Sequence, residues 1–271
     1  MDKSNLYQKV SDYIDLNYQS TDTKKIYKSY SYRFIFGKHP DTIEKLTNDY
    51  LIKILVIIKT RKSLSVYNQY ISIMKIIYQN VLKQNKLKEI KCIKQYPKLK
   101  VLPDIKIVFE KINNILNLKH RTILMTALKT GLRVSELLNI SIHDIDRSQL
   151  KILVKKSKGG NSSFVIMSQE LLNLIERYIL SYNPKYFLFE GLSGKYSKTS
   201  VNNLVKKHIG NKYSIHMLRH LAITYLINKK YSLPQVKLFS RHKSDNAVHF
   251  YYNYDISLFD ELRNSIDNIA I

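Results

Sequence analysis

The chain has 271 residues with 45 Lys or Arg and 21 Asp or Glu, which gives a formal net charge of +24. This length fits one large or two ordinary domains, and a hydrophobic content of 44% is enough for a buried core. The basic excess extends over both halves of the chain and indicates a polyanionic partner, while a single cysteine, Cys92, excludes an internal disulfide or a cysteine-based zinc site.

The N-terminal stretch MDKSNLYQKVSDYIDL is polar and amphipathic, unlike a signal peptide. The most apolar run, residues 51–58, is short and contains Lys53, so it does not predict a membrane span. We therefore expect a soluble, intracellular protein with no membrane partner.

Residues 1–95 predict a small helical domain rich in lysine. Apolar residues recur at helical spacing over 4–18, 22–36, 41–59 and 63–83. N-cap candidates are residues 21–23 for the second helix and Ser63 or Ser65 for the fourth. The methionine and aromatic stripes on these helices predict core packing. Residues 84–103 lose this periodicity and include Pro97 and Pro103, so we expect a basic linker, assigned to 96–103.

Residues 104–271 predict a second domain, mainly α with a small β-hairpin. Gly131 should end a helix, and strands over 150–156 and 163–167 should flank a turn at Gly159-Gly160. Helices are expected over 104–117, 119–130, 134–138, 168–181, 199–208, 214–230, 233–240, 245–252 and 257–268.

Two arginines from different elements could hold a phosphate. Guanidinium groups match the non-bridging oxygens of a phosphodiester with paired hydrogen bonds. Arg133 follows the helix-ending glycine, and Glu136 could orient its surroundings. Arg219 shares a helix face with His216, three residues earlier. His220 lies on the same helix as a packing residue or a supporting member of the site.

A tyrosine cluster follows His242, and a phenol can attack a phosphate once a base or a positive field assists it. Tyr251 and Tyr252 are the candidates, with Tyr254 as a third. The leaving 5′-hydroxyl needs a proton, which a hairpin lysine could donate. Lys158 fits this role, and Lys156 and Lys155 compete with it.

The segments TGLRVSELLNI, SKGG, HMLRH and LFSRHKSDNAVHFYY occur in the order of the boxes of the tyrosine recombinase family, and the chain resembles its phage integrase, Xer and Cre-like members. The resemblance assigns the catalytic positions to Arg133, Lys158, His216, Arg219, His242 and Tyr251. Glu136 becomes the acidic partner, His220 a supporting residue, and Tyr252 the alternative nucleophile. One departure is Arg241, where the family usually has a small glycine.

The resemblance further implies a SAM-like core-binding domain at 1–95 and a catalytic domain at 104–271. It implies site-specific cleavage and rejoining of double-stranded DNA through a 3′-phosphotyrosyl intermediate, without metal or other cofactor. Partners would be DNA, three further copies in a tetramer and, at some sites, accessory DNA-bending proteins. The amphipathic segment 257–268 would dock on a neighbouring copy, with packing on its own domain as the alternative. The enzyme would act wherever its DNA is, in a nucleoid, a nucleus or a viral factory, and a virus or mobile element is the expected source.

Three other functions compete with this interpretation. A type IB topoisomerase shares the chemistry, but the small N-terminal helical domain favours a recombinase. A catalytically inactive DNA-binding protein would not need the full set of residues. A metallohydrolase using His216, His220 and His242 lacks the carboxylate pattern of such sites.

Overall fold

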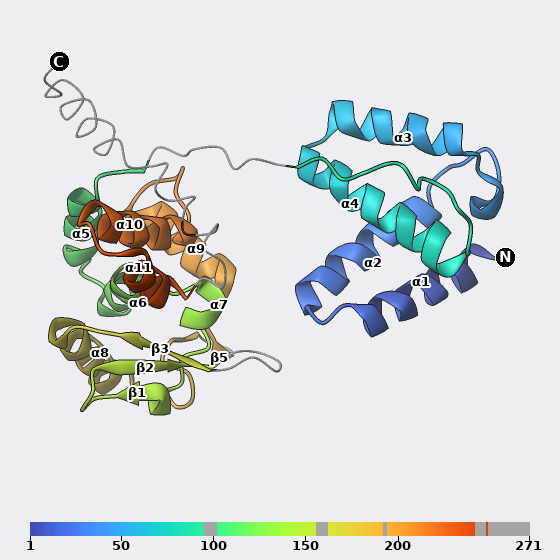
Figure 1. The fold of residues 1–271 in the computed structure, drawn as a ribbon. Coiled ribbons are helices and arrows are strands. Elements are labelled where there is room, and N and C mark those ends of the chain that lie inside the picture. Colours follow the sequence, from blue (N-terminus) through green and yellow to red (C-terminus); the bar gives the residue numbers. More distant parts are fainter. Residues whose placement is uncertain (95–101, 156–161, 192–193, 242–247, 249–271) are drawn as a thin grey trace, which may run out of the picture. The chain divides into compact units, whose positions relative to one another are not determined.

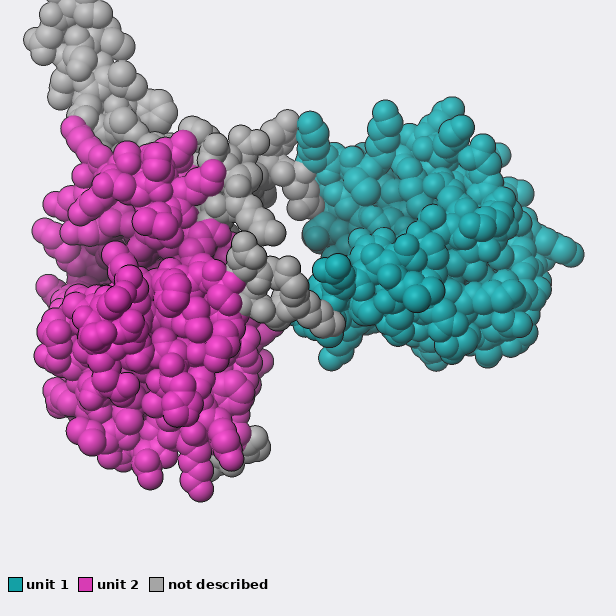
Figure 2. All heavy atoms as spheres, turned by 60° about the horizontal axis from the view of Figure 1, so that its bottom comes forward, with its two compact units in different colours: residues 1–98 teal, residues 99–271 magenta. Residues whose placement is uncertain are grey.

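The computed structural model describes residues 1–94, 102–155, 162–191, 194–241 and 248. The chain divides into two compact units, residues 1–98 and 99–271, traced as ribbons in Figure 1 and coloured separately in Figure 2. Each unit encloses its own apolar cluster. The predicted mainly α fold with a small antiparallel sheet is confirmed.

The first unit is helical throughout its regular elements. These are α1 (Lys3–Asn17), α2 (Thr21–Ile35), the 3₁₀ turn η1 (Ile43–Lys45), α3 (Asn48–Arg61), α4 (Leu64–Lys75) and the π-helical η2 (Ile76–Val81). Ser20, Thr47 and Ser63 each accept a hydrogen bond from the backbone N–H three residues on, at 3.3, 3.3 and 3.4 Å. These side chains satisfy N–H groups that have no partner within the helix, and so fix where three of the helices begin.

The single helix predicted over 41–59 is wrong, because the structure divides this stretch. Leu46 leaves the 3₁₀ turn with an extended backbone (φ −58°, ψ 132°), and its side chain is 2% exposed. Thr47 then caps α3. Burial of Leu46 and a new cap outweigh the continuous helical periodicity of the sequence.

Residues 84–94, where the helical periodicity ends, fall within the domain expected over 1–95 and pack on the first unit. Leu87 is 2% exposed within the core. The Asn68 side chain donates to the carbonyl of Ile93 at 2.8 Å and accepts from its N–H at 2.9 Å. The Lys86 ammonium donates to the carbonyls of Glu44 and Leu46 at 2.7 and 2.6 Å. Irregular backbone anchored in this way has no periodicity to detect.

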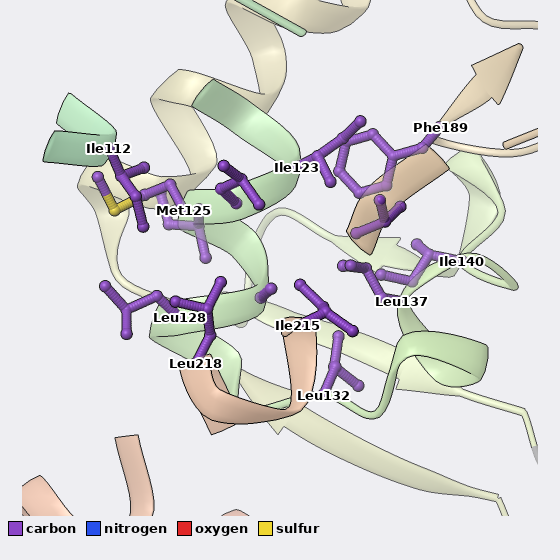
Figure 3. Packing of buried hydrophobic residues seen from close by; sticks show 14 of the residues in the cluster. Ile112, Ile123, Met125, Leu128, Leu132, Leu137, Ile140, Phe189, Ile215 and Leu218 are labelled. Carbon is purple, nitrogen blue, oxygen red and sulfur yellow. The ribbon is translucent and has the colours of Figure 1, made fainter. Parts of the chain in front are cut away.

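The second unit is built around α6 (Leu118–Thr130). Its other elements are α5 (Ile105–Asn113), α7 (Val134–Leu137), η3 (Ile142–Asp144), β1 (Ile145–Asp146), β2 (Lys151–Val154), β3 (Ser163–Ile166), α8 (Gln169–Tyr182), β4 (Glu190–Gly191), β5 (Gly194–Lys195), α9 (Lys198–His208), α10 (Ile215–Asn228) and α11 (Leu233–Ser240). Every residue of α6 from Thr122 to Leu128 is buried. The helices α5, α8, α9 and α10 surround it, and its side chains meet those of α5 and α10 in Figure 3.

The sheet has the order β1-β2-β3, with both pairs antiparallel. Ile152 faces Val165 across the predicted hairpin, and both side chains are buried. Strand β1 was not predicted, because two residues are too short to display an alternating pattern. The predicted hairpin turn lies outside the described residues.

The C-terminal part of the described chain returns to α10 and α11. Val248 is fully buried in a small cluster with Ile223, Ile227 and Val236. Apart from Val248, the helices predicted over 245–252 and 257–268 lie outside the described residues.

Candidate active site

The site is centred on the turn after α6, where Gly131 adopts a left-handed backbone (φ 57°, ψ 23°). A Cβ at this position would lie 2.7 Å from Cε1 of the Phe239 ring. Glycine is therefore required both by the backbone angle and by the approach of α11. This contact lets the turn and the end of α11 lie against one another.

Arg133, two residues later, begins α7 and is bound to Glu136 in two ways. Its backbone N–H donates to Oε2 at 2.9 Å, and its Nη1 donates to Oε1 at 2.8 Å. The Glu136 carboxylate thus caps the first turn of α7 and aligns the guanidinium. The Arg133 side chain is 38% exposed, so it can also reach a ligand.

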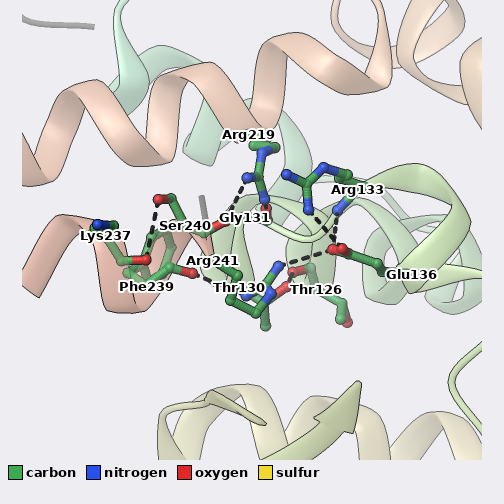
Figure 4. A network of polar contacts seen from close by, with 10 residues as sticks. All are labelled: Thr126, Thr130, Gly131, Arg133, Glu136, Arg219, Lys237, Phe239, Ser240 and Arg241. Atoms are coloured by element: carbon green, nitrogen blue, oxygen red, sulfur yellow. Dashed lines mark hydrogen bonds and ion pairs between the residues drawn. The ribbon is translucent and has the colours of Figure 1, made fainter. Parts of the chain in front are cut away.

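Arg219, on α10, is held differently. It is 3% exposed, and its guanidinium donates to the carbonyl of Gly131 and, at 2.5 Å, to the carbonyl of Ser240. Figure 4 shows Arg219 reaching the turn that carries Arg133. The two arginines proposed from the sequence therefore meet at one turn, and Arg219 joins α10 to the ends of α6 and α11.

Arg241 ends α11 with a left-handed backbone (φ 55°, ψ 36°). Its Nη2 donates to Oε2 of Glu136 at 3.0 Å, and its Nη1 donates to the carbonyl of Phe239 at 2.9 Å. The side chain is 8% exposed, so the extra charge noted in the sequence is buried and paired. An arginine in this conformation costs about 1 kcal/mol relative to glycine, which the ion pair offsets.

The Glu136 carboxylate remains ionised between the two guanidinium groups. Burial raises its pKa, but the hydrogen bond from the Arg133 N–H and the charges of Arg241 and Arg133 outweigh burial, so the pKa lies below its ordinary value. Sequence reasoning missed Arg241 as a partner of Glu136. The only signal was a basic residue at a position where the family usually has glycine.

The histidines on α10 lie on either side of Arg219. His216 is exposed and His220 is partly buried. Since His216 precedes Arg219 by three residues, both project from one face of the helix. The structure therefore brings together Arg133, Glu136 and Arg219 at the Gly131 turn and places His216 and His220 on the helix that carries Arg219. Lys156, Lys158, His242, Tyr251 and Tyr252 lie outside the described residues.

Lys155, a competing candidate for the catalytic lysine, is described. Its ammonium forms an ion pair with Oδ1 of Asp144 at 2.6 Å. Asp144 is 5% exposed and its Oδ2 accepts from the backbone N–H of Ser141 at 2.9 Å. Lys155 therefore links the end of β2 to η3.

Among the described residues, no cluster of three or more His, Cys, Asp or Glu side chains has the arrangement of a metal site. None of the helices in the described ranges combines the length and apolar character needed to cross a membrane.

The family comparison covers more than half of the chain: residues 104–257 match the phage integrase family. The chain is 26% identical over 259 residues to the tyrosine recombinase XerA of Pyrococcus horikoshii, covering 92% of this chain and 88% of that protein. It is 24% identical to a tyrosine recombinase of Thermosipho africanus, covering 97% of this chain and 99% of that protein.

Solved structures share the fold. The recombinase XerH, in a post-cleavage complex with palindromic difH substrate, matches 90% of this chain and 80% of its own at a TM-score of 0.76 and 20% identity. The Tn1549 transposon integrase in complex with right-end DNA matches 98% of this chain and 99% of its own at a TM-score of 0.74 and 16% identity.

The fold and the relatives define a tyrosine-type site-specific DNA recombinase. The chain belongs to the phage integrase family.

Proposed function

We propose that this enzyme cleaves and rejoins double-stranded DNA at specific sites through a 3′-phosphotyrosyl intermediate, with Tyr251 as the nucleophile, on the DNA of a mobile element or virus. The observation that carries the proposal is the convergence of Arg133 and Arg219 on the Gly131 turn. Two permanent cations from separate elements fit the charge that develops on the non-bridging oxygens of a phosphodiester under attack.

The proposed roles follow from how each arginine is held. Arg133 is 38% exposed, and among the described residues its side chain makes one hydrogen bond, to Glu136. Its remaining N–H donors are available for phosphate oxygens. Arg219 adds positive potential from the protein interior, and its hydrogen bond to the Gly131 carbonyl holds the Gly131 turn in place. His216, exposed one helical turn before Arg219, adds a third donor.

His242 and Tyr251 are assigned from the family pattern, nine residues apart. His242 directly follows Arg241, whose contacts with Glu136 and Phe239 are described above. Val248 is buried against α10 and α11 three residues before Tyr251. Three residues of chain span at most about 11 Å, so the covalent chain keeps Tyr251 within that distance of Val248. Tyr252 is the alternative nucleophile.

In the proposed step the Tyr251 oxygen attacks phosphorus and the bond from phosphorus to the 5′-oxygen breaks. The imidazole of His216 or His242 accepts the phenolic proton, and Lys158, or alternatively Lys156, donates a proton to the departing 5′-oxygen. The phosphotyrosyl ester retains the energy of the broken bond, so a 5′-hydroxyl of the same or a partner strand can reverse the reaction. Neither metal nor nucleotide hydrolysis is needed.

Double-stranded DNA is the proposed partner of both units. The net charge of +24 supplies the non-specific attraction to phosphates. In the matched structures, XerH is bound to its palindromic difH substrate, Tn1549 integrase to transposon right-end DNA, and a lambda integrase dimer to a COC′ core site. We expect accessory DNA-bending proteins to assist at some sites, and the enzyme to act wherever its target DNA is located.

We further propose that the enzyme works as a tetramer held together by residues 257–268. This segment is amphipathic, with Leu258, Phe259, Leu262 and Ile266 as apolar members. A hollow of about 540 Å³ lies between α5, α6, α10 and α11, and its mainly apolar lining suits the apolar face of this segment. It is lined by Ile105, Lys106, Phe109, Glu110, Leu128, Lys129, Ala222, Tyr225, Leu226 and Phe239. An apolar groove rimmed by charged residues suits an amphipathic helix from a second copy.

The function is tested with a nicked suicide duplex in EDTA, using wild type, Tyr251→Phe and Tyr252→Phe. The DNA comes from sequences flanking the gene in its genome, selected first for tight binding. We expect a covalent protein–DNA band that disappears only in Tyr251→Phe. Loss only in Tyr252→Phe would move the nucleophile by one residue. Tight binding without a band in wild type would refute the proposal and leave a DNA-binding protein.

Assembly is tested on the same duplex by deleting residues 257–271 and, separately, by Tyr225→Glu in the groove, where Tyr225 is 43% exposed. Tyr231→Glu is the matched control, because Tyr231 is 48% exposed and does not line the groove. We expect the deletion and Tyr225→Glu to lose the multimeric complex while single-site binding remains. Undiminished assembly in both would refute the docking of this segment.

A further inference from the structure

Arg241 occupies a backbone position at which arginine has no advantage over glycine. Its N–H closes α11 by donating to the carbonyl of Lys237 at 2.8 Å, and its φ of 55° is in the left-handed region. Glycine would make the same backbone hydrogen bond without a steric penalty. The reason for an arginine must therefore be found in its side chain.

The side chain points into the protein. It is 8% exposed, and its two hydrogen bonds within the described residues go to the Phe239 carbonyl and to Glu136. Its Nε is buried and has no hydrogen-bond partner among the described residues, so these contacts do not satisfy the guanidinium completely. A side chain selected for stability alone would not leave a buried donor unpaired. A side chain that is buried to this extent does not reach a phosphate in solvent.

Arg241 instead fixes the orientation of Glu136. The carboxylate accepts three hydrogen bonds, from the Arg133 N–H, from Arg133 Nη1 and from Arg241 Nη2. The first two come from α7 itself, a helix of only four residues. Of these three hydrogen bonds, the one from Arg241, 105 residues away in sequence, connects this small helix to the end of α11, as Figure 4 illustrates.

The third bond also changes the charge presented to a ligand. With glycine at position 241, Glu136 would neutralise Arg133 as a simple pair. With arginine, one carboxylate is shared by two guanidinium groups, and the cluster has a net positive charge. An Arg133 with a fixed partner and incompletely neutralised charge is better prepared for a phosphate.

We propose that Arg241 is a positioning residue, which acts through Glu136 to orient Arg133 toward the scissile phosphate. The inference rests on the proposed function, because it requires that Arg133 contact that phosphate.

The test compares single-turnover rates of covalent complex formation on the nicked duplex for wild type, Arg241→Gly and Arg241→Lys. We expect Arg241→Gly to slow cleavage by about ten- to a hundredfold, because small misplacement of a catalytic group has effects of this size. DNA affinity should change little, and the melting temperature should also change little, because the relief of backbone strain at φ 55° opposes the loss of the buried ion pair. Arg241→Lys keeps the charge and should restore part of the rate. Arg147→Ala, which removes an exposed arginine paired with Glu176, is the charge-matched control and should cleave normally.

A double-mutant cycle identifies the route of the effect. If Arg241 acts through Glu136, then Arg241→Gly should add little to the defect of Glu136→Gln, whereas fully additive defects would overturn the proposal. The acid limb of the pH–rate profile, where cleavage slows as pH falls, is a second readout. In Arg241→Gly the burial of Glu136 remains but one of the two charges that lower its pKa is lost, so the limb should move to higher pH.

The outcomes separate the two proposals. Wild-type cleavage that Arg241→Gly leaves unchanged overturns the role of Arg241 and leaves the proposed function intact. Wild-type DNA binding without a covalent complex overturns the proposed function, and the inference with it. A melting temperature that falls in proportion to the cleavage rate overturns the inference in favour of a purely structural role.

Discussion

Arg133 and Arg219 converge on one turn, yet the protein holds them in opposite ways. Arg219 is 3% exposed and binds backbone carbonyls at the ends of two helices. Arg133 is 38% exposed and binds a single carboxylate three residues away. Arg219 is therefore part of the structural framework of the site, whereas Arg133 is held at the surface of that framework, where it can contact a ligand. Four substitutions separate these roles by their effects on stability.

Arg219→Ala should have the largest effect on stability. It leaves the carbonyls of Gly131 and Ser240 buried without a charged donor and opens a cavity. We expect the free energy of unfolding to fall by about 3 kcal/mol or more, measured by denaturant titration. Arg147→Ala, at an exposed ion pair, should lose less than about 1 kcal/mol. Similar losses in the two variants would contradict a framework role for Arg219.

Gly131→Ala should be the next most harmful. It combines a backbone at φ 57° with a Cβ that would lie 2.7 Å from the Phe239 ring, and we expect a loss of about 2–3 kcal/mol. Gly194→Ala is the control, because Gly194 also has positive φ, 100°, but has nothing within 4 Å of the added Cβ. Because a Cβ at φ 100° is at least as strained as one at φ 57°, a larger loss in Gly131→Ala than in Gly194→Ala shows the cost of the contact with α11. A loss well below that of Gly194→Ala would show that the contact is unimportant.

Glu136→Gln should have a smaller effect that depends on pH. The pKa of Glu136 is depressed in the folded protein, so its stabilisation is present above the ordinary value of 4.5 and is lost as pH falls through the folded value. Wild type should exceed the variant by on the order of 1 kcal/mol near neutral pH, and the difference should shrink below about pH 4.5. A difference that is constant from pH 7 to 3 would exclude an ionised Glu136 as its source.

Arg133→Ala should change stability least, by under about 1 kcal/mol, because its ion pair is partly exposed. Its effect on cleavage should nevertheless be on the order of a hundred- to a thousandfold, as for other donors that stabilise transition-state charge. Denaturation and suicide-duplex cleavage of the same preparation measure both quantities. If Arg133→Ala lost stability but cleaved normally, Arg133 would be the framework residue, which would contradict the comparison with Arg219.

Local patterns were sufficient where one element decides its own structure. Ser63 and Ser168 cap helices where the sequence predicted them, and Gly131 ends α6 as expected. Prediction was less accurate at α9, which was expected to begin at residue 199, whereas Ser197 caps it and the helix begins at Lys198. It failed at Leu46, where burial interrupts the expected helix, and it gave no periodic signal for the irregular packing of residues 84–94.

The sequence by itself determined the helical character, the order of the boxes and their assignment to one family, because these depend on spacing along the chain. Only the tertiary structure decided which backbone carbonyls receive Arg219 and which carboxylate receives Arg241. These partners are 21 to 105 residues apart, and no local preference specifies a hydrogen bond over such a separation. Packing of α11 against the Gly131 turn creates these contacts, and with them the geometry of the site.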